Sequence, residues 1–130
     1  MLKIVLADDQ ASVRRGIRGL LEDEPDLEVT GEAENGAEAV EMTGRLKPDI
    51  LVTDLRMPYL DGIQVTEIVA RSCPDCRVTI LSMYGSKPYV EAAVRAGACG
   101  HVLKKFSADG LLEAIRTVAT GGSYFRYLNT

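Results

Sequence analysis

The sequence predicts a single α/β domain, in which helices cover both faces of a parallel β-sheet. Apolar periodicity alternates between a strand pattern and a helix pattern, and this βα unit occurs five times along the chain. The predicted strands are nearly continuous in valine, isoleucine and leucine, which is typical of parallel strands buried on both faces. With 130 residues, 46% of them hydrophobic, the chain is long enough to bury the core of one domain.

The first two βα units are predicted between Leu2 and Pro48. The first strand runs from Leu2 to Ala7, and the helix after it continues until Pro25 interrupts the pattern. Leu27 to Val29 is predicted as the second strand, and Gly36 opens a helix that Lys47 and Pro48 close. The apolar faces of these two helices are predicted to be Val13, Ile17, Leu20 and Leu21, and Ala37, Val40 and Leu46.

The next two units follow the same alternation. Ile50 to Thr53 is the third predicted strand, and a helix after it ends near Pro74. Val78 to Leu81 is the fourth strand, and Pro88 suits the first turn of a helix that stops at Gly97. The helix faces are predicted to be Ile63, Ile68 and Val69, and Tyr89, Val90, Ala93 and Val94.

The last unit begins with a short fifth strand, Val102 to Leu103. Ser107 is a suitable N-cap for the last helix, and Gly121 and Gly122 lie beyond its end. Its predicted apolar face is Leu111, Leu112, Ile115 and Val118.

Polar side chains stand where four of the predicted strands end. Asp8 and Asp9 follow the first strand, Asp54 follows the third, Ser82 the fourth and Lys104 the fifth. The carboxyl ends of parallel strands meet at one edge of the sheet, where α/β folds place their binding crevice. We therefore expect these five side chains to form one site.

This residue set suits phosphoryl chemistry. Neighbouring carboxylates repel one another unless a cation binds between them, and Mg²⁺ prefers such hard oxygen ligands. Lys104 can pair with a phosphoryl oxygen as a mobile point charge, and Ser82 can donate a hydrogen bond to the same group. Together with a carboxylate nucleophile, these groups are what an aspartyl-phosphate intermediate requires.

Composition excludes some partners and suggests a compartment. A net charge of −4 and a pI of about 5.0 argue against a nucleic-acid surface. No apolar run approaches the roughly 20 residues that cross a membrane, so the chain is predicted to be cytoplasmic, without membrane contact. Three cysteines suit a reducing compartment, and we interpret Cys73 and Cys76 as a thiol pair in a loop, not as a zinc site or a redox motif.

Four segments carry a family resemblance. They are Val5 to Asp9; Asp49 to Pro58 with Asp61-Gly62; Leu81 to Met83; and Gly97 to Lys104. With these motifs in order, residues 2 to 122 resemble a response-regulator receiver domain of two-component systems. Leu81 to Tyr84, and Ala114 to Arg116 through Gly121-Gly122, resemble the NarL/FixJ (LuxR-type) receivers in particular.

The resemblance implies a flavodoxin-like (βα)5 fold with strand order 2-1-3-4-5. It implies a role for each site residue. Asp54 is the phosphoacceptor, and Ser82 and Lys104 are phosphoryl-binding groups. The ligands of Mg²⁺, or of Mn²⁺ as the alternative, are Asp8, Asp9, Asp54 and the main-chain carbonyl of Arg56. The implied donor is a phosphohistidine of a sensor histidine kinase. Phosphorylation would switch the surface of the fourth helix, fifth strand and fifth helix, with homodimerisation as a consequence.

Two features depart from the family pattern, and two further residues flank the site. His101 occupies the place where these domains carry a rotating tyrosine or phenylalanine, so it is either a switch residue, sensitive to pH, or a surface histidine on an edge strand. Lys105 and Phe106 follow Lys104 in place of the usual proline or aspartate. Met57 and Tyr84 are predicted to flank the site.

The sequence predicts the domain boundary and leaves more than one way in which the domain could act. Residues 1–122 are predicted to be the receiver domain, and residues 123–130 a tail or the start of a linker. Output is expected through transcription, by a helix-turn-helix domain absent from this chain that alone would touch DNA; a stand-alone receiver acting by protein binding or phosphorelay is the alternative. A Mg²⁺-dependent aspartyl phosphohydrolase is disfavoured, because such enzymes need a second acid where Arg56 stands. The domain is thus not expected to be an enzyme beyond its own phosphorylation and dephosphorylation.

Overall fold

The computed structural model describes residues 1–83, 85–106 and 110–125. The strands, all parallel and in the order β2-β1-β3-β4-β5, are β1 (Leu2–Ala7), β2 (Leu27–Ala33), β3 (Ile50–Asp54), β4 (Arg77–Ser82) and β5 (Gly100–Leu103). The helices are α1 (Ala11–Glu22), α2 (Gly36–Leu46), α3 (Gly62–Ser72), α4 (Lys87–Ala96) and α5 (Leu112–Ala119), with a short 3₁₀ turn, η1 (Lys104–Phe106). The predicted flavodoxin-like fold and strand order are confirmed.

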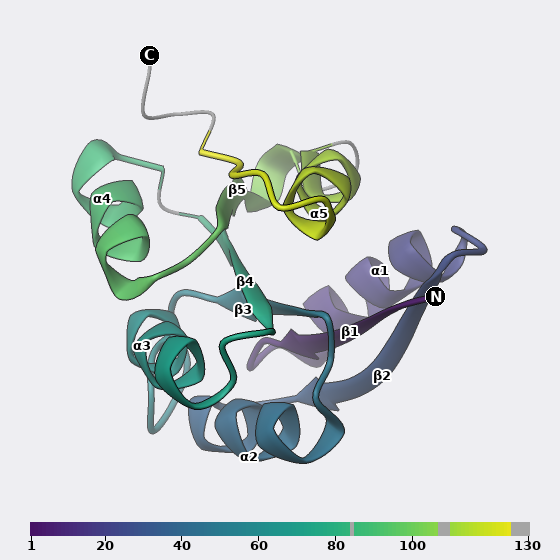
Figure 1. The fold of residues 1–130 in the computed structure, drawn as a ribbon, viewed down its shortest axis with the longest axis horizontal. Helices are drawn as coiled ribbons and strands as arrows, with labels where there is room; N and C mark the ends of the chain where they lie inside the picture. Colours follow the sequence, from purple (N-terminus) through teal and green to yellow (C-terminus); the bar gives the residue numbers. More distant parts are fainter. Residues whose placement is uncertain (84, 107–109, 126–130) are drawn as a thin grey trace.

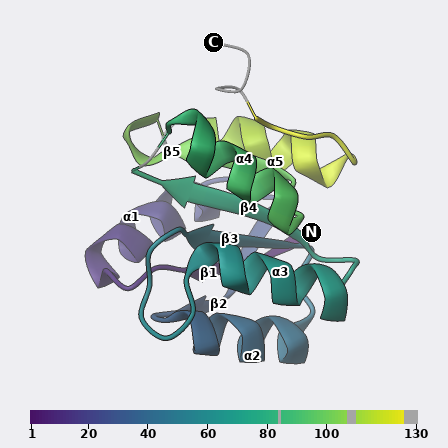
Figure 2. The ribbon, with the colours of Figure 1, turned by 90° about the vertical axis from the view of Figure 1, so that its left-hand side faces the viewer.

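Helices cover both faces of the sheet, with α1 and α5 on one side and α2, α3 and α4 on the other (Figure 1, Figure 2). Each face has its own core. On the α1/α5 side Ile4 and Ile50 pack against helix residues such as Leu21 and Ile115, all fully buried. On the other side Val5 and Leu51 pack against residues such as Val65.

The register of the strands brings the polar strand ends together. Ala7 lies beside Thr53 in the β1–β3 pair, so the residues that follow, Asp8 and Asp54, are neighbours. Asp54 in turn lies beside Leu81, and Ser82 lies beside Leu103. Lys104 follows immediately, and all four strands therefore end at one edge.

Side-chain caps begin two of the helices next to this edge. Asp61 accepts a hydrogen bond from the Gln64 N–H, while the Gln64 side chain accepts one from the Asp61 N–H, which forms a capping box at the start of α3. The Asn35 side chain accepts from the Glu38 N–H at the start of α2. Such caps satisfy N–H groups that have no partner within the helix and fix where each helix begins.

The buried face of α2 differs from the predicted face. Gly36, Ala39 and Thr43 are buried, whereas Ala37 is exposed. A Cβ on Gly36 would lie 1.9 Å from the Leu60 carbonyl oxygen, so the helix approaches the β3–α3 loop more closely than any side chain allows. An apolar pattern cannot reveal a contact that depends on the absence of a side chain. Ile68 and Val94, predicted on apolar faces, are likewise exposed.

The segment after α5 packs along β5. The Tyr124 N–H donates to the Cys99 carbonyl at 2.9 Å, and the His101 N–H donates to the Tyr124 carbonyl at 2.8 Å. Tyr124 is itself buried in the α1/α5 core. The first residues of the predicted tail, up to Phe125, thus contact the domain, and the boundary at residue 122 stays a prediction. The predicted N-cap Ser107 lies outside the described residues.

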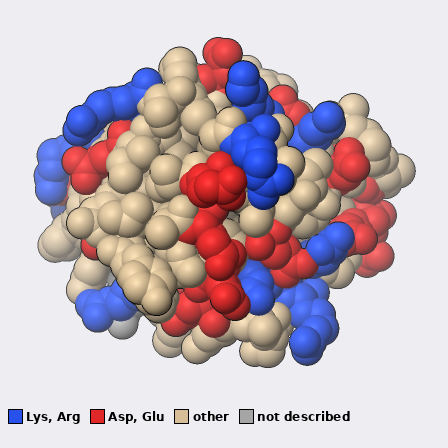
Figure 3. All heavy atoms as spheres, turned by 90° about the horizontal axis from the view of Figure 1, so that it is seen from below, with Lys and Arg blue, Asp and Glu red and all other residues tan. Residues whose placement is uncertain are grey.

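Charge is mixed on the part of the surface around α2, which lies lowest in Figure 1. Figure 3 shows acidic side chains gathered in a band across this face, flanked by separate groups of basic ones.

The described helices include none that is long and apolar enough to span a membrane.

Candidate functional site

Three carboxylates form the centre of the site. Asp8, Asp9 and Asp54 each offer an oxygen, and these oxygens all lie within 4.8 Å of one another. Asp8 and Asp54 are buried and Asp9 is exposed, so the cluster is open on one side. The structure thus brings together the three acids that the sequence placed at the ends of two strands.

The Asp54 carboxylate is held by the backbone that follows it. Oδ1 accepts a hydrogen bond from the Leu55 N–H at 2.8 Å, and the Leu55 carbonyl accepts from the Gly62 N–H at 2.8 Å, which ties the end of β3 to the start of α3. Burial, and then the negative charge of Asp8, raise the pKa of Asp54 above the usual value for a carboxyl, against the opposing charge of Lys104. A cation that binds beside Asp54 would relieve this penalty.

Asp8 is fixed by neighbours that the sequence did not reveal. Its Oδ1 accepts from the Gln10 N–H at 2.9 Å, and its main-chain carbonyl accepts from the Arg14 guanidinium. Arg14 also pairs with Glu32 on β2, with 3.3 Å between Nε and Oε1. The position of Arg14, on the turn of α1 that follows the acid pair, is the one sequence signal that could have suggested this contact.

Lys104 joins two of the acids. Its Nζ lies 2.9 Å from Oδ2 of Asp8 and 3.3 Å from Oδ2 of Asp54, and 18% of its side chain is exposed. Partial burial disfavours the charged amine, but the hydrogen bonds and charges of Asp8 and Asp54 outweigh burial and raise the pKa of Lys104. The ammonium group is therefore already positioned against the predicted phosphoacceptor.

Ser82 and His101 are both fully buried. Ser82 ends β4, one residue beyond the partner of Asp54, as the sequence predicted. His101 lies beside Ile80 in the β4–β5 pair, and the Tyr124 segment covers the outer edge of β5. The interpretation of His101 as a surface histidine on an edge strand is therefore wrong, because that edge is not open.

Arg56 and Met57 leave the end of β3 in different directions. Arg56 is exposed, and with Asp9, Asp54 and Lys104 it lines a cavity of about 170 Å³ over the carboxylates. Met57 Sδ lies 3.9 Å from Oγ1 of Thr53, and Met57 is not among the residues that line this cavity. Tyr84, the other predicted flanking residue, lies outside the described residues.

The carboxylate cluster fits a hard divalent cation. Mg²⁺ takes one or two protein carboxylates and keeps several waters, which suits a buried acid pair with an open side. Among the described residues, this is the one group of three or more potential metal ligands.

The predicted thiol pair lies in a turn. The Cys76 N–H donates to the Cys73 carbonyl, and burial raises the pKa of the Cys76 thiol to about 12, which keeps the thiol protonated.

The Asp54→Asn variant is expected to be more stable than the wild type by about 1 kcal/mol at pH 7 in EDTA, the scale of one unit-charge contact in water. A carboxyl whose folded pKa is raised contributes stability below its unfolded pKa and loses it as the pH rises through the folded pKa. The difference should therefore grow from pH 3 toward neutrality. Urea unfolding at both pH values measures it. The exposed Asp75→Asn is the control, and an Asp54→Asn variant no more stable than wild type at pH 7 would contradict the burial penalty.

Known proteins are similar to this chain over most of its length. Residues 4–116 match the family model of the response regulator receiver domain. The transcriptional regulatory protein DegU of Brevibacillus brevis is 37% identical over 123 residues, 95% of this chain and 52% of that protein. The oxygen regulatory protein NreC of Staphylococcus haemolyticus is 40% identical over 124 residues, 95% of this chain and 57% of that protein. The chain thus spans about half the length of these curated relatives.

Solved structures agree. The receiver domain of the putative response regulator NarL from Mycobacterium tuberculosis matches with a TM-score of 0.87 and 33% identity over 92% of this chain and 97% of that one. A LuxR-family response regulator from Aurantimonas matches with a TM-score of 0.91 and 32% identity over 95% of this chain and 89% of that one. The fold, the family match and these relatives together place the chain in the response-regulator receiver family of two-component systems, among the NarL/LuxR-type regulators.

Proposed function

We propose that this receiver domain accepts a phosphoryl group on Asp54 from a phosphohistidine of a sensor histidine kinase. The observation that carries the proposal is the contact of Lys104 with both Asp8 and Asp54 beside a cluster of three carboxylates. The nucleophile, the metal ligands and the cationic clamp of an aspartyl-phosphate site thus come from the ends of three strands.

Each residue has a defined part in this reaction. Asp8, Asp9, Asp54 and the Arg56 carbonyl would hold Mg²⁺, which supplies charge neutralisation at the phosphoryl oxygens when bound. Oδ2 of Asp54 is the proposed attacking atom, because it faces Lys104, whereas Oδ1 accepts the Leu55 N–H. Lys104 would exchange its contact with Asp54 for the phosphoryl group, and Ser82 would donate a hydrogen bond to that group.

A protein donor fits the surface beside the site. A groove of about 590 Å³ borders Lys104 on the α1 side, and Val13, Met83 and Leu103 give it apolar walls. Met83 is 76% exposed, next to the buried Ser82. An apolar surface adjoining the phosphoacceptor supports docking of a kinase helix there.

The output is proposed from the relatives. DegU and NreC are named as regulatory proteins about twice as long as the region matched here, which supports transcription control through a helix-turn-helix domain beyond residues 1–122. DNA contact would belong to that domain, and the net charge of −4 fits this division. We further propose that the protein acts in the cytoplasm, where such kinases present their phosphohistidine.

The test of phosphorylation uses acetyl phosphate with Mg²⁺, followed by intact-mass detection. The wild type should gain one phosphoryl group, and excess EDTA should suppress the gain by at least about tenfold, because the carboxylates would again repel the incoming phosphate. Asp54→Ala should gain none, while the exposed Asp75→Ala should react as the wild type does. An adduct that survives Asp54→Ala would refute the proposal.

His101 is proposed to couple phosphorylation to homodimerisation, because it is buried in β5 next to the α4 and α5 surface. His101→Ala is expected to shift the dimerisation constant measured by sedimentation with beryllofluoride by about tenfold or more, while His101→Phe, which keeps a ring in the slot, shifts it less. An unchanged dimerisation constant in His101→Ala would exclude this role.

A further inference from the structure

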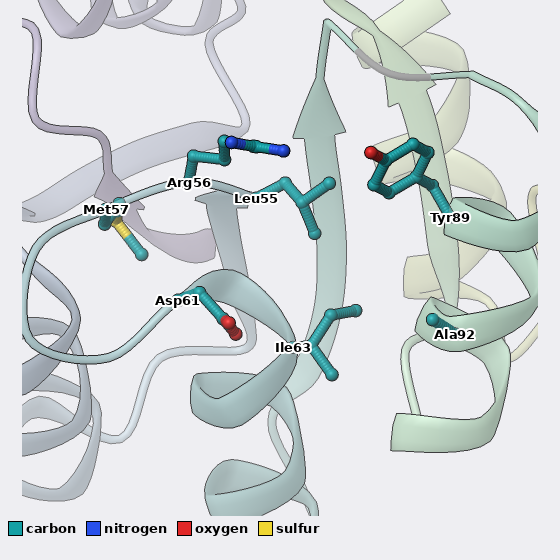
Figure 4. Close-up of a pocket in the computed structure, with 7 residues that line it drawn as sticks. All are labelled: Leu55, Arg56, Met57, Asp61, Ile63, Tyr89 and Ala92. Atoms are coloured by element: carbon teal, nitrogen blue, oxygen red, sulfur yellow. The ribbon is translucent and has the colours of Figure 1, made fainter.

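A second cavity lies next to the phosphoacceptor, between the β3–α3 loop and the N-terminal parts of α3 and α4. Its volume is about 490 Å³, within the range of small-molecule sites. We call it the α3–α4 groove; Leu55, Met57, Ile63 and Ala92 form its apolar surface, and Arg56 and Tyr89 its polar end. Figure 4 shows the Arg56 guanidinium and the Tyr89 hydroxyl pointing toward one another across that end, with Leu55 and Ile63 between the two sides.

Arg56 connects this groove with the site of phosphorylation. It lines both the α3–α4 groove and the 170 Å³ cavity over Asp54. Leu55, which lies in the groove, donates its N–H to the Asp54 carboxylate. A ligand whose phosphoryl group sits over Asp54 can therefore place the rest of its body in the groove without leaving the reach of Arg56.

Arg56 can bind an anion at the polar end of the groove. A guanidinium group binds a carboxylate through two parallel hydrogen bonds, and the Tyr89 hydroxyl can donate a third. Asp61 also lines the groove, but its carboxylate accepts the Gln64 N–H at 2.8 Å and is held against the positive N-terminus of α3. Apart from Arg56, Tyr89 and Asp61, the groove is lined by the apolar side chains of Leu55, Met57, Ile63 and Ala92.

We propose that the α3–α4 groove binds the leaving group of aromatic acyl phosphates, so that these small molecules are preferred phosphodonors for Asp54. The proposal rests on the proposed function of Asp54. An Asp54 oxygen attacks phosphorus, the bond between phosphorus and the acyl carboxylate oxygen breaks, and the carboxylate departs with the bonding electron pair. Arg56 and Tyr89 stabilise the departing carboxylate, while the ring packs on Leu55, Ile63 and Ala92. No proton and no further reactant is needed.

This occupant explains the groove better than an aromatic side chain of a partner protein does. A side chain would fill the apolar part of the groove but would not also reach Asp54. An acyl phosphate brings a ring, a carboxylate and a phosphoryl group in one molecule, in the order in which groove, Arg56 and Asp54 receive them. Acetyl phosphate shares the phosphoryl and carboxylate groups but has only a methyl group to place in the groove.

The test compares benzoyl phosphate with acetyl phosphate as donors to the whole chain with Mg²⁺, by the second-order rate of adduct formation. The ratio of the two rates cancels changes that affect Asp54 itself. Ala92→Leu and Ala92→Met both fill the apolar part of the groove. Ala96→Leu, one turn later on α4 and outside the groove lining, is the matched control.

In the wild type, benzoyl phosphate should react at least about tenfold faster than acetyl phosphate, the factor expected from packing one ring against apolar groups. Both Ala92 variants should reduce that ratio to near one, with acetyl phosphate rates within about twofold of the wild type, and Ala96→Leu should keep it. A ratio that the Ala92 variants leave unchanged would overturn the groove proposal and leave the function of Asp54 standing. No adduct from either donor on the wild type would instead remove the proposed function, and this inference with it.

Discussion

Replacing Gly62 by alanine is expected to lower the free energy of unfolding by about 3 kcal/mol, the upper end of the usual cost of adding a methyl group to a packed interior. A Cβ on Gly62 would lie 2.3 Å from the Asp54 carbonyl oxygen and 2.9 Å from Cα of Leu55. These are backbone atoms at the end of β3, which cannot rotate away as a side chain can. Urea denaturation gives the magnitude.

The same substitution should also damage the site. Relief of the contact displaces Asp54 and Leu55, and thereby the Leu55 N–H that orients the Asp54 carboxylate at 2.8 Å. We expect adduct formation with acetyl phosphate to fall at least about tenfold, since sub-ångström misplacement of reacting groups has effects of this order.

Gly44→Ala provides the matched control for this variant. Gly44 is exposed within α2, and a Cβ there meets nothing within 4 Å. Alanine is a better helix former than glycine, so this variant should gain about 0.5–1 kcal/mol. If Gly62→Ala proved as stable as Gly44→Ala, the close contact between α3 and the end of β3 would be contradicted.

Replacing Lys104 by methionine is expected to cost about 2 kcal/mol of unfolding free energy at pH 7 in EDTA. The loss of one partner from a buried ion pair costs about 3–5 kcal/mol, and the 18% exposure of the Lys104 side chain reduces this figure. The variant leaves Asp8 and Asp54 facing each other without a cation. Millimolar Mg²⁺ should restore part of the lost stability, because it neutralises the same oxygens.

Lys87→Met serves as the control for Lys104→Met. Its side chain is 72% exposed, and its ion pair with Glu91 is a surface pair one helical turn away. Such pairs contribute about 0.3–0.5 kcal/mol, so the control should change little, with or without Mg²⁺. Equal costs for the two lysine variants would show that Lys104 is not the cation that holds the acid pair.

The sequence could predict most of the fold and the central residues of the site. Parallel strands buried on both faces have a strong apolar signature, and their carboxyl ends must share one edge of the sheet. The sequence alone therefore predicted that Asp8, Asp54 and Lys104 lie close together, as they do. Motif order then supplied the strand order, which periodicity alone does not determine.

What escaped prediction depends on contacts between segments distant in the chain. Arg14 reaches the Asp8 carbonyl only because α1 packs beside β2, where Glu32 also holds it. The Tyr124 segment accepts the His101 N–H along the outer edge of β5, and no local pattern marks that segment as a partner. Ala37 is exposed because Gly36 makes the close approach to Leu60.

Site mapping of the phosphorylated residue tests the central claim most directly. Borohydride reduces an aspartyl phosphate to homoserine, so treatment of the acetyl phosphate product, followed by peptide mass spectrometry, marks the residue that carried the phosphoryl group. The mark should fall on Asp54 and depend on Mg²⁺. A mark on Asp8 or Asp9, or no mark on a protein that has gained a phosphoryl group, would contradict the assignment of Asp54 as the phosphoacceptor.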